Sequence, residues 1–503
     1  MNELDEIREQ MKKVSYYEDA ARGLTFDQST VCPEEAMEEK NEMIAFLEQQ
    51  AFLLRRSSDF SEKVRHLYEK RETLGEWEEG MIRMLFRQEL LERNLTPEKA
   101  FAFSLTEKKA FVDWSRAKEA SDFSLFRDSL ASVIAVNQEK SALRVLTEEE
   151  KTRIKTNYDR LLDLFERGMT EESIDPLFEE TKERLGALVS RIRGSRKHIR
   201  TDFLSRRGPE GEQRRVTAFL MELQGFDQIR GTWSESEHAY TERLSRNDIR
   251  ITTHIYPECF LSNVYTTLHE TGHAIFDQRQ PKESSDYFLT ESKTFGMHES
   301  VSRFYENILG RSEEFLSFIY PKLKELMPEA LSGVSERELY EAANLVTPSL
   351  IRTEADEVTY AFHVIIRYEL EKELFHGKLS VDELPAAWKE KHREYLGVVP
   401  ENDREGVLQD VHWTSDFGYF PTYLLGNFYN AMYYRSMQEE IDVPGALRRG
   451  DFSPMNDWME RRVFRKADLL TPAEWIRDIT GRDLTADDFL TYLEQKYEKL
   501  YEL

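Results

Sequence analysis

The stretch TTLHETGHAIFD, residues 266–277, places two histidines four positions apart around a glutamate. On an α-helix, positions i and i+4 lie on one face, so the imidazoles of His269 and His273 could hold a single metal ion. Glu270 would lie beside that face, within reach of a water molecule on the ion. Zinc suits these ligands, because a catalytic zinc binds neutral imidazoles and keeps one position open for water.

A catalytic zinc site needs a third protein ligand. The segment MHESVSRFYEN supplies Glu299, 26 residues after His273, on what the pattern predicts to be the next helix of an antiparallel pair. Glutamate-zincins place a carboxylate at this kind of separation. The alternative is a solvated surface glutamate, although His298 and Arg303 among apolar residues are an unusual composition for a plain surface. We therefore predict His269, His273 and Glu299 as the ligands, with His298 beside them.

Such a site favours hydrolysis of amide bonds. Zinc lowers the pKa of a bound water and polarises a carbonyl, while Glu270 can take the proton of that water and pass it to the leaving amine. Other zinc hydrolyses stay open, and so does a peptide-binding zinc protein without turnover. A closed structural site would need a fourth protein ligand, yet neither Cys32 nor Cys259 lies in a zinc-binding spacing.

The elements around this motif are predicted to be mostly helical. The first two hundred residues show helical apolar spacing, as in MEEKNEMIAFLEQQAFLLRR. Several residue pairs predict helix starts: Thr96 before Pro97, Thr147 with Glu150, and Asp175 before Pro176.

Strand character is concentrated at about residues 226–256, where the run DIRITTHIY alternates between two faces. Residues 237–241 could form a neighbouring strand. After about residue 262 the helical pattern returns. The sequence therefore predicts one peptidase domain over residues 1–503, mainly α, with a small sheet beside the metal helix and a metal-binding core at about 262–310.

Charge and composition exclude several classes of partner. The 503 residues include 95 acidic and 69 basic side chains, a formal net charge of −26, which disfavours nucleic acid and anionic membranes. No apolar run approaches the ~18–20 residues of a membrane span, and the charged N-terminus does not resemble a secretory signal. Two cysteines without a disulfide pattern favour a reducing compartment. We expect a cytoplasmic protein.

Several separated motifs resemble the carboxypeptidase Taq family of thermostable metallocarboxypeptidases. The matching motifs are DIRIT (248–252), HETGH (269–273), HES (298–300), IRTEAD (351–356), GVLQDVHW (406–413) and FGYFPTY (417–423), with weaker similarity at 158–170. One position departs from the family: His238-Ala239-Tyr240 stands where the family usually has His-Pro-Phe. Six ordered motifs are far more specific than a lone HExxH.

This resemblance implies a zincin-like helical body split by a deep substrate groove, related to the oligopeptidases and peptidyl-dipeptidases. The implied activity is release of single residues from peptide C-termini, with broad side-chain preference and poor release of a terminal proline. Zinc or cobalt as the ion and a homodimer as the assembly are family expectations. An oligopeptidase or dipeptidyl carboxypeptidase is the alternative within the same chemistry.

A carboxypeptidase must bind a free carboxylate, which a guanidinium does with a planar fork. Spacing alone makes Arg352 and Asp356 an ordinary intrahelical ion pair. The family motif instead favours Arg352 as the group that reads the substrate terminus, held in place by Asp356. Arg250 is a second candidate for substrate contact, and its alternative role is a polar ladder on one strand face.

A tetrahedral oxyanion also needs hydrogen-bond donors. In the related zincins a histidine and a downstream tyrosine supply them, so we predict His412 and Tyr423 in this role. Tyr419 is a weaker candidate for substrate contact and could be a core aromatic. Asp410 could orient His412, its alternating neighbour in an extended run. His238 could present an edge strand to the substrate backbone.

Overall fold

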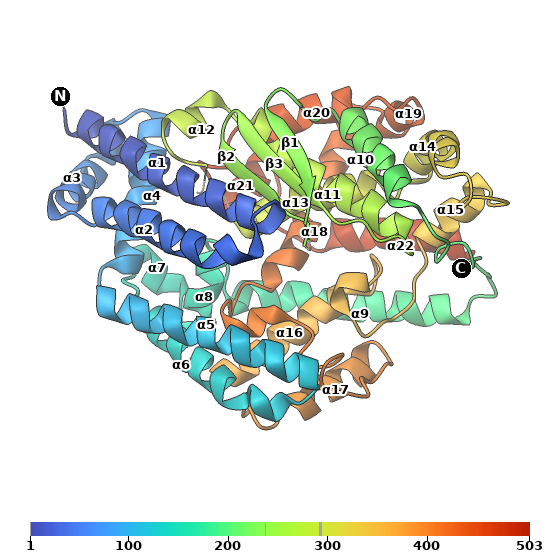
Figure 1. Cartoon of the computed structure of the whole chain (residues 1–503), viewed down its shortest axis with the longest axis horizontal. Coiled ribbons are helices and arrows are strands. Elements are labelled where there is room, and N and C mark those ends of the chain that lie inside the picture. Colours follow the sequence, from blue (N-terminus) through green and yellow to red (C-terminus); the bar gives the residue numbers. More distant parts are fainter. Residues whose placement is uncertain (1, 237, 291–293) are drawn as a thin grey trace.

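The computed structural model describes residues 2–236, 238–290 and 294–503, and it shows long helices packed around one small sheet (Figure 1). The first half of the chain forms α1 (Glu3–Thr30), α2 (Met37–Arg55), α3 (Ser58–Glu69), α4 (Glu76–Glu92), α5 (Pro97–Ala120), α6 (Arg127–Leu143), α7 (Glu148–Arg153), α8 (Asn157–Phe165), α9 (Glu171–Gly194) and α10 (Glu210–Gln224). The strands are β1 (Gly231–Glu235), β2 (Thr241–Ser245) and β3 (Asp248–Thr253).

Helices return after the sheet, as the pattern predicted. They are α11 (Phe260–Arg279), α12 (Lys282–Asp286), α13 (Phe295–Arg303), α14 (Glu313–Leu326), α15 (Glu336–Ala343), α16 (Tyr360–Phe375), α17 (Leu384–Tyr395), α18 (Pro421–Glu440), α19 (Val443–Arg448), α20 (Ser453–Met459), α21 (Pro472–Thr480) and α22 (Asp487–Tyr501). Three short segments bear on the site: the π-helix η4 (Phe304–Leu309) and the 3-10 turns η5 (Arg352–Glu354) and η6 (Val411–Thr414). The mainly helical class is confirmed.

Two of the three predicted helix starts are correct. The hydroxyl of Thr96 accepts a hydrogen bond from the amide of Lys99 at the start of α5, and Thr147 with Glu150 forms a full capping box. The start predicted at Asp175 is wrong. Helix α9 begins at Glu171, after the cap at Thr170, and runs through Pro176.

The sheet has the strand order β1-β3-β2, with β1 parallel and β2 antiparallel to the central strand. The alternation predicted for β3 is correct, because Ile249 and Ile251 are fully buried and pack with Ala274 of α11. The neighbouring strand predicted at 237–241 lies instead at Thr241–Ser245; residue 237 is outside the described part of the chain. The sheet thus lies against the helix that carries the metal motif.

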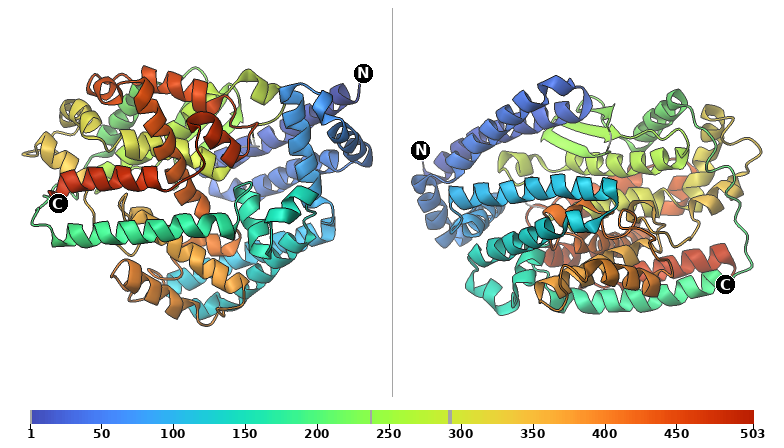
Figure 2. Two further views of the ribbon diagram at one scale, coloured as in Figure 1. Left: turned by 180° about the vertical axis from the view of Figure 1, so that it is seen from behind. Right: turned by 60° about the horizontal axis from the view of Figure 1, so that its bottom comes forward.

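Two apolar cores hold most of the helices together. The larger core draws on side chains from α5 through α22, and a smaller one joins α1, α3 and α4 through Ile7, Val64 and Met81. Both figures place α1–α4 together at the N-terminal end of the molecule (Figures 1 and 2). The predicted α2 is present, although its apolar residues Met43 and Phe46 face outward. The single-domain boundary and the substrate groove stay predictions.

Among the described residues, no helix combines the length and the apolar character that crossing a bilayer requires.

Candidate metal centre

Helix α11, which carries the HETGH motif, is buried on almost all sides. Fifteen of its residues are buried, including the polar Thr267, Thr271 and Asp277, so it is a core helix rather than an amphipathic surface helix. It contacts α10, α13, β2 and β3. A motif in this position is held rigidly by packing.

Gly272 lets the two ligand-bearing helices approach closely. A Cβ atom at this position would lie 2.9 Å from the Cα atom of Ser302 at the end of α13 and 3.0 Å from the ring of Tyr305. The first distance is to backbone, which cannot rotate away. The glycine inside the motif therefore sets the distance between α11 and α13.

The start of α13 is held by a buried carboxylate. Glu166 accepts hydrogen bonds from the Thr294 hydroxyl (2.8 Å), the Gly296 amide (2.9 Å) and the Tyr429 hydroxyl (2.9 Å). Burial raises the pKa of Glu166 to about 7 against the effect of these three bonds. A carboxylate at a helix N-terminus satisfies amides that have no partner within the helix. This contact places α13, and with it the predicted ligand Glu299.

The three predicted ligands converge. Oε2 of Glu299 lies 3.9 Å from Nε2 of His269 and 3.8 Å from Nε2 of His273. The two imidazole rings are 4.9 Å apart at an angle of 81°. All three ligand atoms lie within 4.8 Å of one another, and the side chains are largely shielded from solvent.

This donor set fits a divalent ion. Bonds of about 2.1 Å at tetrahedral angles would place ligand atoms about 3.4 Å apart, close to the distances found. Among the described residues, the group of metal-binding side chains consists of these three alone. Three protein ligands leave a coordination position open, which is the catalytic rather than the structural type of site.

Two charged side chains orient the ligands. Arg303 donates to Oε1 of Glu299 at 2.6 Å, which leaves Oε2 for the ion. Nδ1 of His269 lies 2.8 Å from Oε2 of Glu306. Because the ionised carboxylate of Glu306 can only accept, Nδ1 of His269 donates to it, and Nε2 is the ring nitrogen that would face a metal.

Glu306 is a functional residue that the sequence analysis missed. Burial alone would raise its pKa, but the hydrogen bond and charge of His269, with Arg303 and Arg311, lower it to about 2. Glu306 is therefore ionised and stabilises the imidazole it binds. Its position seven residues after Glu299, two turns along the same helical face, was the available signal.

His298 lies beside His273, one of the predicted ligands. Its ring stacks on His273 with 4.3 Å between centroids and 12° between planes, and its Nε2 lies 3.7 Å from Oδ1 of Asp277. These contacts restrain the plane of the His273 imidazole.

Glu270 faces the sheet side of the site. Its Oε2 lies 2.8 Å from the hydroxyl of Thr241 on β2, which lies 2.9 Å from the Glu270 carbonyl oxygen as well. Burial raises the pKa of Glu270 to about 7, although His269 and Thr241 act against this rise. A carboxylate with a pKa near the working pH suits a general base. The contact of Thr241 with Glu270 was not predicted from the sequence.

Arg352 lies near the metal centre and uses two of its three guanidinium nitrogens in hydrogen bonds. Its Nε donates to Oδ1 of Asp410 at 3.0 Å and its Nη1 to the hydroxyl of Tyr360 at 3.2 Å. Nη2 makes no hydrogen bond to any described residue. The ring of Tyr423 lies 5.2 Å from the Arg352 guanidinium and 5.8 Å from that of Arg303, and Arg303 in turn binds Glu299.

Two predicted supporting roles are wrong. Asp356 does not hold Arg352, because its carboxylate accepts from Thr347, Val358 and Thr359 instead. The turn at Arg352–Glu354 is a single 3-10 turn, so Asp356 is not one α-helical turn further on. Asp410 does not hydrogen-bond to His412. Its Oδ1 is bound by Arg352, and Nδ1 of His412 has no partner among the described residues.

The three aromatic candidates form one cluster. His412 lies parallel to Tyr419 at 5.6 Å and edge-on to Tyr423 at 6.3 Å, and the two tyrosines are 5.2 Å apart. Burial lowers the pKa of His412 to about 4, so its imidazole is neutral near pH 7 and does not act as a cation. Burial raises the pKa of Tyr423 well above 10, which keeps its hydroxyl protonated as a donor.

The remaining candidates lie on the sheet. Arg250 donates to both oxygens of Asp248, at 2.9 and 2.8 Å, and its guanidinium lies 5.3 Å from the ring of Phe26 on α1. His238 is exposed, just before the edge strand β2. No contact between either side chain and the metal-site residues is found in the described part of the chain. Tyr240, which departs from the family pattern, binds the hydroxyl of Ser29 on α1.

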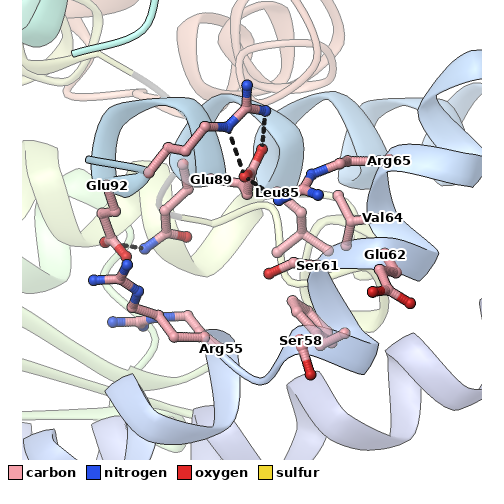
Figure 3. A pocket seen from close by; sticks show the side chains of 13 residues that line it. Arg55, Ser58, Ser61, Glu62, Val64, Arg65, Leu85, Glu89 and Glu92 are labelled. Carbon is pink, nitrogen blue, oxygen red and sulfur yellow. Dashed lines mark hydrogen bonds and ion pairs between the residues drawn. The ribbon is translucent and has the colours of Figure 1, made fainter. Parts of the chain in front are cut away.

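A separate hollow of about 250 Å³ lies among α2, α3 and α4 (Figure 3). Its charged groups bind one another: Arg65 and Arg93 both donate to Glu89. It shares no lining residue with the metal centre.

Known proteins resemble this chain over most of its length. The family model for carboxypeptidase Taq (M32) metallopeptidases matches residues 6–497. Carboxypeptidase 1 of Bacillus subtilis is 35% identical over 494 residues, which cover 98% of this chain and 97% of that protein. Thermostable carboxypeptidase 1 of Thermus thermophilus is 38% identical over 421 residues, covering 83% and 82%. The crystal structure of an M32 carboxypeptidase from Deinococcus radiodurans matches with a TM-score of 0.95 at 29% identity, covering 100% of both chains.

Proposed function

Because the chain belongs to the carboxypeptidase Taq (M32) metallopeptidase family and is therefore a metallocarboxypeptidase, we propose that it uses zinc to release single amino acids from peptide C-termini. One observation carries this proposal: Arg352 lies near a metal centre of three ligands. Its guanidinium contacts Tyr423, which also contacts Arg303, the side chain that binds Glu299. Broad side-chain preference, with poor release of a terminal proline, belongs to the proposal.

Zinc bound by His269, His273 and Glu299 would polarise the scissile carbonyl and make a water molecule more acidic. Cobalt would suit the same donors. Glu270 accepts the proton of the attacking water, and the hydroxyl of Thr241 holds its carboxylate in place. The same carboxyl then delivers that proton to the leaving amine.

The other side chains bind the substrate and the developing charge. Nη2 of Arg352 donates to the terminal carboxylate, while Asp410 and Tyr360 hold the guanidinium. The protonated hydroxyl of Tyr423 and the neutral imidazole of His412 donate to the oxyanion. Tyr419, Arg250 and His238 are proposed to line a groove that leads to this centre.

The decisive experiment incubates the zinc-loaded protein with a free peptide and with the same peptide amidated at its C-terminus. Mass spectrometry should show stepwise loss of single residues from the free peptide and almost no reaction of the amide. Internal cuts, or equal cleavage of both peptides, would indicate an oligopeptidase instead. A Glu270→Gln protein should bind zinc but lose nearly all turnover.

We also propose a cytoplasmic homodimer. The absence of a disulfide pattern supports the compartment, and both cysteines are free. Analytical ultracentrifugation of the purified chain tests the dimer, which a sedimenting species of 59.4 kDa would contradict.

A further inference from the structure

Three aromatic rings meet at the start of the helix that carries Glu299. Phe295 of α13 lies 5.9 Å from Phe165, the last residue of α8, and 5.1 Å from Tyr419. Phe165 and Tyr419 are 5.4 Å apart. The interplanar angles of 58°, 82° and 75° are tilted to edge-on, as in favourable aromatic pairs.

This cluster adjoins the metal centre and is open to solvent. Phe295 precedes Glu299 by four residues, so the two side chains lie on one face of α13. The side chain of Phe295 is 52% exposed to solvent. Together with the half-buried Phe165 and Tyr419 it forms a contiguous aromatic surface, and such a surface beside a catalytic centre is typical of a place that a ligand covers.

The cluster is also held firmly. Glu166 follows Phe165 directly and binds the hydroxyl of Thr294 and the amide of Gly296, the residues on either side of Phe295. The end of α8 is thereby joined to the start of α13. The two phenyl rings keep their spacing without a substrate.

We propose that Phe165, Phe295 and Tyr419 form an apolar wall that receives the side chain of the residue just before the scissile bond. This inference rests on the proposed function and adds a substrate class to it: peptides with an apolar or aromatic residue at the penultimate position. Such substrates bury their side chain against the wall, whereas glycine leaves the wall exposed.

The contacts along the site indicate that the wall binds the residue before the scissile bond rather than the leaving residue. The leaving residue extends from the metal centre to Arg352, whose guanidinium lies against Tyr423 and Phe420. Phe165 and Phe295 contact Tyr419, and among the described residues neither ring contacts Arg352. A peptide that runs past the ligands therefore reaches the wall with its preceding residue.

The apolar character of the wall also disfavours acidic residues there. A penultimate glutamate would have to bring its charge against an apolar surface, which costs desolvation free energy.

The test uses N-acylated dipeptides that end in alanine and carry glycine, leucine, phenylalanine or glutamate before it. Wild type should cleave the phenylalanine substrate best and the glutamate substrate worst. Phe295→Ala should lower kcat/KM for the phenylalanine substrate by about tenfold and leave the glycine substrate within about twofold. Phe295→Leu should restore most of the loss.

Phe101→Ala is the matched control, because Phe101 is an exposed phenylalanine on α5. It should leave the whole series unchanged. A second series keeps glycine before the scissile bond and varies the last residue, and Phe295→Ala should not alter its order.

The proposed wall would be wrong if Phe295→Ala lowered kcat/KM equally for the glycine and phenylalanine substrates. It would also be wrong if this variant changed the order of preference for the last residue in the second series. A wild-type enzyme that releases terminal residues without any preference at the penultimate position would overturn it too, while leaving the proposed function intact. A protein that releases no terminal residue from any substrate would refute the proposed function itself.

Discussion

Replacing Arg352 should abolish the preference for a free carboxylate while sparing turnover of amidated peptides. Arg352→Met alone would leave Asp410, which is 6% exposed, as an unpaired buried charge. Breaking a buried pair in this way costs about 3–5 kcal/mol of folding free energy. The sharper perturbation is Arg352→Met with Asp410→Asn, which removes both charges and keeps both shapes approximately.

The size of the expected loss in kcat/KM follows from the single hydrogen bond that Nη2 of Arg352 can make to the substrate. Nη2 of Arg352 offers one charge-assisted hydrogen bond to the terminal carboxylate, worth about 1.5–3 kcal/mol. At about 1.4 kcal/mol per factor of ten, this corresponds to about 10- to 150-fold in kcat/KM for the free peptide. The amidated peptide never makes this bond, so its slow cleavage should change by less than about threefold.

The assay measures kcat/KM for one peptide in both forms and reports their ratio. Any loss of folded protein cancels in the ratio, because both substrates meet the same enzyme. Arg393→Met, which removes an exposed arginine on α17, should leave the ratio unchanged. Equal losses on the free and amidated peptides would refute the assignment of Arg352 to the terminus.

Three further changes test the site and its support. Glu306→Gln should weaken zinc binding by about tenfold or more, measured by competition with a chelator, because His269 loses an ionised acceptor; unchanged affinity would contradict that role. Gly272→Ala should destabilise the fold by about 1–3 kcal/mol in urea, whereas the matched helical Gly186→Ala, whose new Cβ meets nothing within 4 Å, should be neutral or stabilising. Burial alone would raise the pKa of Asp163, but three arginines hold it well below its usual range; its folded pKa is thus below the unfolded value of about 3.9, and its contribution is present above about pH 4 and lost below it. Asp163→Asn should lower Tm at pH 7, and the two melting curves should converge as the pH falls below about 4.

Local signals in the sequence were sufficient for the two histidines of the metal motif and for two of the three predicted helix starts. His269 and His273 share a face because a helix turns once in 3.6 residues, and nothing outside that helix alters this relation. The caps at Thr96 and Thr147 are equally local, since each is a contact across three residues. Asp175 before Pro176 carried the same signal and was misleading, because Thr170 had already started the helix.

The partners of the catalytic groups were beyond these signals. Thr241 reaches Glu270 from a strand 29 residues earlier, and no periodicity relates two different elements. Asp410 reaches Arg352 across 58 residues, so a nearer carboxylate, Asp356, was predicted in its place. Glu306 was within the helical period of Glu299, but only the packing of η4 against α11 directs it to His269.

The amino-acid order alone therefore specified a mainly helical chain with two histidines on one helical face, since helical period and capping depend on residues a few positions apart. Which side chain orients each ligand, which acid holds Arg352, and which rings surround Tyr419 became visible only once helices and strands were packed together. The reason is physical: a hydrogen bond or ring contact between elements depends on their relative placement to within about an ångström, and that placement arises from the burial of many side chains at once.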